Sequence, residues 1–213
     1  LKVLRGTRLR AWIDAKGEVV GTEKLVNIPL TGSSPEEIAF VYAALNHLCS
    51  SYYLQKAIFS ETTESARVMD GQYSKSIPIP SISEETEATV AHLAWTLTLA
   101  RQVEHDSSRD YTTEITELQS SLSAILSTLY LELEVGNVSQ WSATIITDRP
   151  AIDHVKTLFQ DFYTERFAKP DGDSKQYWEE IESVVKATSD TVSDWNTDRV
   201  ANSDEIKVIN DVL

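Results

Sequence analysis

The amino-acid sequence predicts an α/β (α+β) protein, in which a small β-rich module with packed helices precedes a long antiparallel helical hairpin and further helices. Two observations predict this fold class, and the chain length bounds the number of domains. Apolar and basic residues alternate loosely over residues 2–14 and further apolar residues occur through residues 18–30, which is typical of strands. Apolar residues then recur at steps of three and four along stretches that begin near Ser34, Ser83 and Asp110, which is typical of helices packed on a core. A chain of 213 residues suits one to two domains.

The predicted strands lie in the first thirty residues. Residues 2–14 alternate loosely, with arginines between the apolar positions, and predict one strand with a basic face. Ala15-Lys16-Gly17 predicts a hairpin turn. Residues 18–30 contain enough valine, leucine and isoleucine for a second strand or a pair of strands, and Thr31-Gly32-Ser33 predicts a loop.

A strong helix start follows this loop. Ser34 is a good N-cap, Pro35 suits the first helical position, and Glu37 stands where a capping box needs a carboxylate. The helix is expected to run to about Phe59, and residues 60–76 are expected to be polar and irregular. The apolar residues of this helix share one face: Ile38, Val41, Leu45, Leu48 and Tyr52.

Two further helices are predicted after a proline-rich segment. The prolines of Ile77-Pro78-Ile79-Pro80 exclude helix and central strand there, and Gly71-Gln72-Tyr73 predicts a turn that presents polar side chains. Ser83 predicts the cap of a helix that ends near Glu104, and Asp110 predicts the cap of the next one. Two long helices joined by a short polar loop favour an antiparallel hairpin.

The rest of the chain is expected to be mostly helical. Residues 138–148 have weak strand character, and Arg149-Pro150 marks a boundary. Residues 151–168 and about 177–195 predict amphipathic helices, separated by a turn at Pro170-Asp171-Gly172-Asp173.

Charge is distributed unevenly along the chain. The formal net charge is −14, whereas surfaces that bind nucleic acid are normally basic. Residues 1–80 carry nine basic and eight acidic side chains, and residues 81–213 carry ten basic and 25 acidic ones, so these parts have net charges of +1 and −15. The acidic part is either a plain solvated surface or a surface that faces away from an anionic ligand held by the first part.

The sequence contains no recognisable catalytic or metal-binding pattern. Cys49 is interpreted as a buried small residue, and Asp171-Gly172-Asp173 lacks the later ligands of a calcium loop. A single cysteine excludes an internal disulfide and fits a reducing cytoplasm. The sequence contains no run of about 18 apolar residues, so no membrane span is predicted. The chain begins at Leu1, so we expect a fragment of a longer protein. Four widely separated histidines are interpreted as surface or satisfied helix residues: His47, His92, His105 and His154.

Two groups of side chains predict an interaction surface. Arg8 and Arg10 share one face of the expected strand, and guanidinium groups suit phosphates and the guanine edge. The alternative for this strand is a charged edge that prevents sheet aggregation. Near the proline-rich segment, Gln72 suits adenine, Lys75 suits a phosphate and Tyr73 suits a sugar or base, and the alternative there is a plain surface turn. The other candidate residues of these two groups are Arg5, Lys16 and Arg67.

Four segments, in this order, resemble a known family. They are Val3 to Ala11 with Asp14 to Gly17, Ala44-Leu45-Asn46 after Ile28-Pro29, Gly71-Gln72-Tyr73, and Ile77-Pro78-Ile79-Pro80. Followed by the two predicted helices, they are similar to the C-terminal target-recognition (specificity) regions of adenine-type DNA methyltransferases and combined restriction–modification enzymes, and to the specificity subunits of type I systems. The resemblance covers about residues 1–135, and the stretch 129–134 departs from the family's pattern.

This resemblance implies a DNA sequence-recognition module of a restriction–modification or phage-defence DNA methyltransferase, without catalysis in this chain. It implies double-stranded DNA and an N-terminal methyltransferase domain of the parent chain as partners. S-adenosylmethionine would bind to that methyltransferase domain, and no cofactor is expected in this chain. The chain is expected to lie in the cytoplasm and to make no membrane contact. The implied division is an α/β target-recognition domain in residues 1–82, a helical spacer hairpin in 83–135 and a mostly helical extension in 136–213. The alternative function is an acidic helical protein–protein interaction scaffold.

Overall fold

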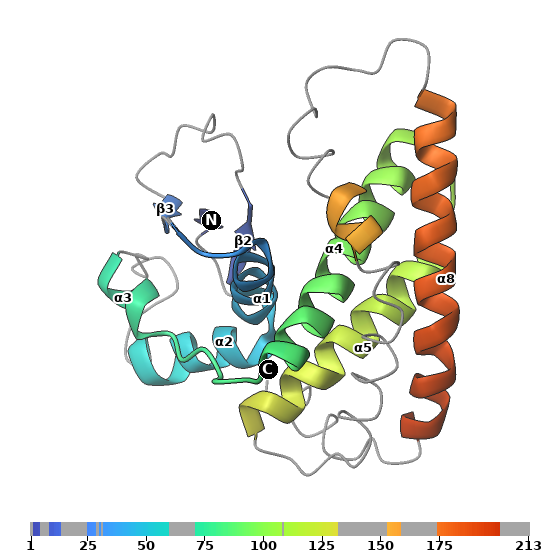
Figure 1. The fold of residues 1–213 in the computed structure, drawn as a ribbon. Coiled ribbons are helices and arrows are strands. Elements are labelled where there is room, and N and C mark those ends of the chain that lie inside the picture. The colour runs from blue at the N-terminus through green and yellow to red at the C-terminus, as the bar shows by residue number, and fades with distance from the viewer. Residues whose placement is uncertain are drawn as a thin grey trace.

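The computed structural model of the chain is mostly helical (Figure 1). It describes residues 2–4, 9–13, 25–28, 30, 32–59, 71–107, 109–131, 153–158 and 174–200. Its helices are α1 (Pro35–Asn46), α2 (Leu48–Tyr53), the π-helix η1 (Leu54–Ile58), α3 (Gly71–Ser76), α4 (Glu84–Ser107), α5 (Thr112–Leu131) and α8 (Ser174–Val200). Residues 153–158 form a further short helical stretch.

The predicted fold class, an α/β (α+β) protein with a β-rich first module, is wrong for the part of the chain that the structure describes. Strands β1 (Lys2–Leu4), β2 (Arg10–Trp12) and β3 (Leu25–Asn27) have three residues each, whereas α4, α5 and α8 have 24, 20 and 27. Such short strands bury little apolar surface, so helices supply most of the described core.

The three strands form one small antiparallel sheet in the order β2-β1-β3. Val3 of the central strand pairs with Ala11 on one side and with Val26 on the other. The prediction of a single strand over residues 2–14 is therefore wrong, because this segment supplies two strands that pair with each other. The turn predicted at residues 15–17 lies outside the described residues.

Helix α1 begins where the sequence predicts. The Ser34 hydroxyl accepts a hydrogen bond from the backbone N–H of Glu37, and the Glu37 carboxylate accepts one from the backbone N–H of Ser34, which confirms the predicted capping box. The helix ends at Asn46, however, because His47 has an extended backbone (φ −73°, ψ 150°) and caps α2 with its own ring. The predicted single helix to Phe59 is replaced by α1, α2 and η1.

Residues 71–76 form helix α3 instead of the predicted turn. The following segment, Ile77-Pro78-Ile79-Pro80, is neither helix nor strand, as its two prolines require. Ile77 is buried in a small apolar cluster that joins β2 to the helices of the N-terminal part. We call this the N-terminal cluster, and its buried members are Leu9, Ala11, Leu45, Leu54, Phe59 and Ile77, with Tyr73 packed against them.

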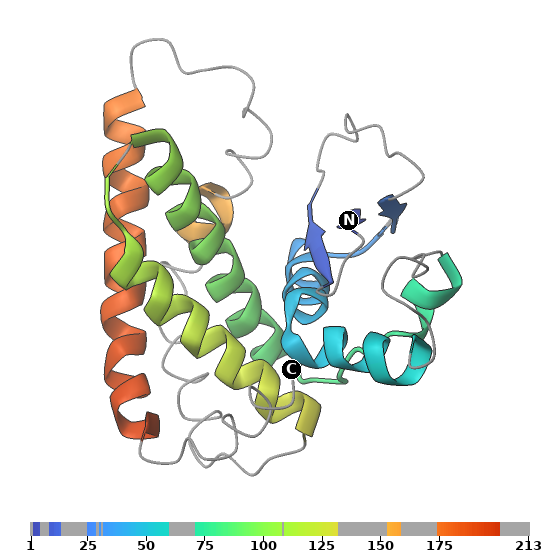
Figure 2. The ribbon, with the colours of Figure 1, turned by 180° about the vertical axis from the view of Figure 1, so that it is seen from behind.

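Helices α4, α5 and α8 pack together as a bundle, and α1 packs on α4. Figures 1 and 2 show this bundle on one side of the molecule and the sheet with α2 and α3 on the other. Ser83 and Asp110 accept hydrogen bonds from the backbone N–H groups of Thr86 and Thr112, so the two predicted caps are confirmed. Helices α4 and α5 confirm the helices predicted behind them, and α8 confirms the one predicted near 177–195.

The larger core fills the bundle. It also receives Val155 and Leu158 from the stretch 153–158. Its largest fully buried side chains are Trp95, Leu93, Leu99, Leu118, Ile125, Leu126, Ile181, Val90, Val103 and Val155.

Some predictions fall on parts of the chain that the structure leaves out or does not test. The weak strand at 138–148 and the turn at 170–173 lie outside the described residues. The division into residues 1–82, 83–135 and 136–213 stays a prediction. Within the described residues, no helix combines the length and apolar character needed to cross a membrane.

Candidate functional site

Strand β2 presents Arg10 to solvent. Its neighbours Leu9 and Ala11 are buried in the N-terminal cluster, whereas Arg10 is exposed. This alternation is expected for a strand with one covered face, because successive side chains point to opposite sides. The guanidinium group of Arg10 is therefore available to an external ligand.

The outer edge of β2 is held by side chains instead of by a further strand. Oδ1 of Asn46 accepts a hydrogen bond from the backbone N–H of Ala11 at 3.0 Å, and Nδ2 of Asn46 donates to the carbonyl of Ala11 at 3.0 Å. Nδ2 also donates to the carbonyl of Tyr42 in α1 at 2.8 Å. Ser51 Oγ accepts a hydrogen bond from the backbone N–H of Leu9 at 3.0 Å. The junction of α1 and α2 thus fixes β2 on both sides of Arg10.

Two more exposed cations lie on elements of the N-terminal part: Lys56 on η1 and Lys75 on α3. Helix α3 is anchored beside them by Tyr73, whose ring packs edge-on against Phe59 with ring centres 5.3 Å apart. Because Phe59 belongs to the N-terminal cluster, the position of Lys75 depends on the same apolar contacts as that of β2.

The structure describes only part of the predicted DNA-contacting set. Arg10 and Lys75 are exposed on β2 and α3, and Tyr73 is half-buried between α3 and Phe59. Gln72 lies within α3. The remaining predicted residues lie outside the described residues: Arg5, Arg8, Lys16 and Arg67.

A buried polar junction connects the α1–α2 break to α5. His47 Nδ1 accepts a hydrogen bond from the backbone N–H of Cys49 at 3.3 Å, so in the neutral ring the proton sits on Nε2. Nε2 lies 3.2 Å from the carbonyl oxygen of Ser123 and 3.2 Å from Ser127 Oγ. Because Nε2 is the donor, it cannot also remove a proton from the Ser127 hydroxyl. This pair is therefore a structural contact and not a nucleophile with its base.

Tyr130 closes the same junction from α5. Its ring stacks on His47 with ring centres 5.5 Å apart and 6° between the planes. Its hydroxyl lies 2.8 Å from Ser50 Oγ and donates to the carbonyl of Ala44 at 3.2 Å. Ser50 Oγ donates to the same carbonyl at 2.7 Å, so both hydroxyls satisfy a carbonyl at the C-terminal end of α1.

Burial controls the ionisation of these groups. It lowers the pKa of His47 to about 4, although the hydrogen bond to the Ser123 carbonyl acts in the opposite direction. It raises the pKa of Tyr130 to about 12 and also raises the pKa of the half-buried Cys49 thiol. At neutral pH all three groups are uncharged, which gives no activated nucleophile.

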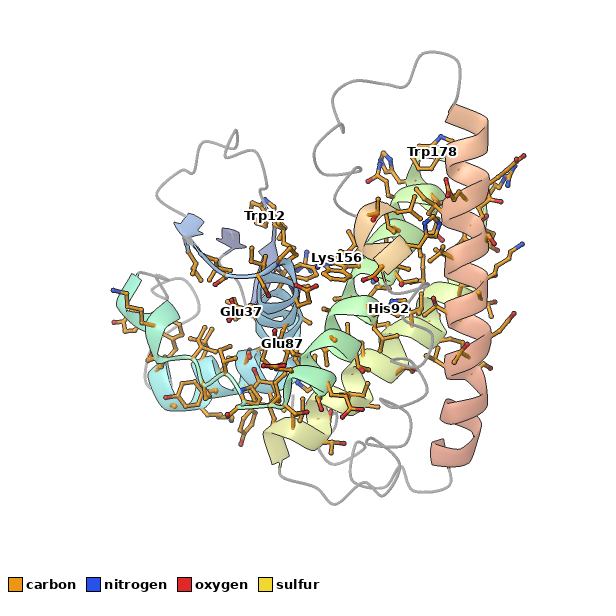
Figure 3. The ribbon with its side chains drawn as sticks, viewed as in Figure 1. Trp12, Glu37, Glu87, His92, Lys156 and Trp178 are labelled. Atoms are coloured by element: carbon orange, nitrogen blue, oxygen red, sulfur yellow. The ribbon has the colours of Figure 1, made fainter. Side chains whose placement is uncertain are left out.

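His92 is the second buried imidazole, and it lies inside the bundle (Figure 3). Its Nε2 lies 3.4 Å from Thr188 Oγ1, and the Thr188 hydroxyl itself donates to the carbonyl of Val184. His92 Nδ1 has no hydrogen-bond partner within the described part of the chain. Burial lowers the pKa of His92 to about 4, so this ring is also neutral at physiological pH.

Acidic side chains gather where α1 meets the start of α4. Burial raises the pKa of Glu87, and the charges of Glu37, Glu36 and Glu84 raise it further. Burial also acts to raise the pKa of Glu36, but hydrogen bonds from Lys156, from the backbone and from Ser34, together with the charge of Lys156, outweigh it and lower that pKa. Figure 3 shows Glu37 and Glu87 at this contact between the two helices.

Metal-ligand geometry and similarity to other proteins are two further sources of evidence about function. Among the residues that the structure describes, no group of three or more His, Cys, Asp or Glu side chains is arranged to hold a metal ion. Comparisons with protein-family models, with curated proteins and with solved structures find no match to the chain.

Sequence reasoning missed the residues that organise the junction: Asn46, His47 and Ser51. The first two interrupt an apolar helical pattern, and asparagine favours helix ends because its side chain competes for backbone hydrogen bonds. That feature could have located the end of α1. Their partners in the β2 segment and in α5 could not be found in this way, because these lie 35 to 80 residues away.

Proposed function

We propose that the chain is a DNA sequence-recognition module of a restriction–modification or phage-defence methyltransferase, which binds double-stranded DNA through the exposed cations of its N-terminal part. The observation that carries this proposal is the N-terminal cluster. It brings together residues from all four segments that resemble the specificity regions: Ala11, Leu45, Tyr73 and Ile77. The segments are far apart in the sequence, so their meeting indicates one structural unit.

The distribution of charge supports DNA binding at this unit. The cations Arg10, Lys56 and Lys75 are exposed on β2, η1 and α3. Among the described residues before position 80, the acidic side chains Glu36 and Glu37 lie at the start of α1, where their charges act on the bundle, and the other six acidic side chains of residues 1–80 lie outside the described residues. Cations that neutralise phosphates release counterions from DNA, so exposed cations on these elements can bind DNA even on a protein with a net charge of −14.

Binding of the 213-residue chain to a random pool of duplex DNA tests the proposal. Fluorescence anisotropy at low and then moderate salt should show an affinity that falls steeply with salt concentration. The variant Arg10→Ala/Lys75→Ala should bind about tenfold more weakly or worse, and the slope of log affinity against log salt should shrink by about 1 for each lost phosphate contact.

A matched control separates the proposed surface from general charge. The variant Arg101→Ala/Lys186→Ala removes one exposed arginine and one exposed lysine from α4 and α8, so it changes the net charge equally. This control should bind DNA like the unmodified chain. Equal loss in both variants, or no binding at low salt by the unmodified chain, contradicts the proposal.

The acidic surface of the bundle favours a second candidate, a scaffold for a basic protein partner. Exposed carboxylates occur in the first turn of α4, at Glu84 and Glu85, and on α8, at Glu179 and Glu180. A lysine-rich peptide added in place of DNA in the same assay distinguishes the two functions. Binding of the peptide without binding of DNA supports the scaffold.

A further inference from the structure

The amide of Asn46 takes the place of a neighbouring strand at the outer edge of β2. It satisfies both the N–H and the carbonyl of Ala11, as a paired strand would, while its second N–H is anchored on Tyr42 in α1. We propose that Asn46 is a positioning residue for DNA binding, which acts through the orientation of Arg10. This inference rests on the proposed function.

The geometry of the sheet explains how Asn46 controls Arg10. The backbone groups of one strand residue point to the same edge, and those of the next residue point to the opposite edge. Since Ala11 bonds outward to Asn46, the groups of Arg10 and Trp12 face β1, where they stand opposite Leu4 and Lys2. The strand is therefore held by β1 at Arg10, and by side chains of the α1–α2 junction at Leu9 and Ala11.

Ser51 completes this arrangement at Leu9, the outward-facing residue on the other side of Arg10. With both neighbours bonded, the backbone of β2 has little freedom to rotate, and the direction in which the Arg10 side chain leaves the strand is fixed. A preorganised arginine loses less conformational entropy when it binds phosphate or a base edge. Loss of Asn46 should therefore weaken DNA binding only through Arg10.

The side chain of asparagine suits this position for chemical reasons. It combines one carbonyl acceptor with two N–H donors, which matches the three backbone groups that it contacts. Aspartate could accept from Ala11 N–H but could not donate to the two carbonyls, and alanine could do neither. Asn46 is itself exposed at the end of α1 and is not a member of the N-terminal cluster, so we expect its replacement by alanine to preserve the apolar contacts of that cluster.

A double-mutant cycle on DNA affinity tests the inference. The chain, Asn46→Ala, Arg10→Ala and the double variant are compared in the anisotropy assay at one low salt concentration. We expect Asn46→Ala to weaken binding about fivefold, and the double variant to bind no more weakly than Arg10→Ala alone. Gln119→Ala is the control, because it removes an exposed side-chain amide that accepts from Arg101 within the bundle, and it should leave affinity unchanged.

The possible results separate this inference from the proposed function. If the unmodified chain binds no duplex DNA at low salt, both are wrong. If the chain binds DNA and Asn46→Ala weakens binding equally with and without Arg10, only the positioning role is wrong. The positioning role is also wrong if Asn46→Ala speeds amide exchange at Ala11 but leaves the affinity for DNA unchanged.

Amide hydrogen exchange and circular dichroism monitor the structure of each variant. Faster exchange at Ala11 with unchanged helix content is the expected result for Asn46→Ala. If this variant loses helix content, Ser51→Ala takes its place in the cycle, since it removes only the bond to Leu9 and the same criterion of coupling to Arg10 applies.

Discussion

At the scale of single residues, the two buried imidazoles differ in how their nitrogen atoms are satisfied. His47 uses both nitrogens, with Cys49 on one side and Ser123 and Ser127 on the other. His92 has a long contact to Thr188 and an Nδ1 atom without a partner among the described residues. A buried polar group without a partner costs free energy, whereas a satisfied one stabilises the fold modestly.

This difference predicts opposite effects for one substitution. His47→Leu should lower the free energy of unfolding by about 2 kcal/mol or more. The substitution leaves the backbone N–H of Cys49 and the Ser127 hydroxyl of α5 without the imidazole nitrogens that they contact. His92→Leu should be neutral or stabilising, since it removes from the bundle core a nitrogen that has no partner among the described residues. Denaturant unfolding at pH 7 measures both, and a larger loss in His92→Leu would refute the argument.

Residues of this kind also mark where sequence reasoning fails. Ser34 and Glu37 could be identified as a capping box because the motif is complete within four consecutive residues. The role of His47 could not, because its ring is fixed by serines 76 and 80 positions further on. Arg10 could be predicted as exposed from alternation alone, but the residues that hold its strand belong to the end of a helix.

At the scale of elements, helix boundaries are set by local chemistry at one end and by tertiary contacts at the other. The start of α1 follows from its own residues, as do the caps of α4 and α5. The end of α1 at Asn46 depends on contacts with β2 and α5. The sequence pattern lacks these contacts and therefore predicts a helix that continues to about Phe59. The predicted turn at residues 71–73 similarly became the start of α3, since Tyr73 packs on Phe59.

The capping box gives a prediction at this scale. Ser34→Ala removes the acceptor for the N–H of Glu37 and should lower the free energy of unfolding by about 1 kcal/mol. Ser33→Ala is the control, because the hydrogen bond from residue 33 to the Leu30 carbonyl uses only its backbone N–H and survives the change. Thermal unfolding followed by circular dichroism compares the two, and equal losses would contradict a specific role for the cap.

At the scale of the whole molecule, the predicted α/β class is wrong because apolar residues in residues 2–30 form only short strands among the described residues, whereas long helices form most of the described core. Strands β1, β2 and β3 have three residues each. The bundle was easier to predict, since α4 and α5 show their apolar period directly in the sequence. The packing of α8 across both could not be inferred, because it joins helices that are far apart in the sequence and no local pattern encodes which faces meet.

The stability of the whole molecule should depend on pH through its two buried histidines. Burial lowers the pKa values of His47 and His92 to about 4, below the value of about 6.5 for an unfolded chain. Between these values the unfolded chain binds more protons, so acidification favours unfolding. Each histidine should remove about 2 kcal/mol from the free energy of unfolding between pH 7 and pH 5, and little more below pH 4.

Denaturant unfolding at several pH values measures this effect. His92→Leu should show a weaker loss of stability between pH 7 and pH 5 than the unmodified chain, because one of the two titrating groups is gone. The carboxylates contribute equally to both proteins and cancel in the comparison. Parallel pH curves for the two proteins would mean that His92 is accessible to protons in the folded state.

The late position of α8 has a consequence for the synthesis of this chain on the ribosome. Helices α4 and α5 are complete at Leu131, but the helix that covers them begins only at Ser174. At about 5–20 residues per second, the intervening residues take roughly 2 to 8 seconds to translate. During that interval the hairpin displays the apolar face that Ile181, Val185 and Val192 later cover, and we expect chaperones that hold nascent chains to bind it.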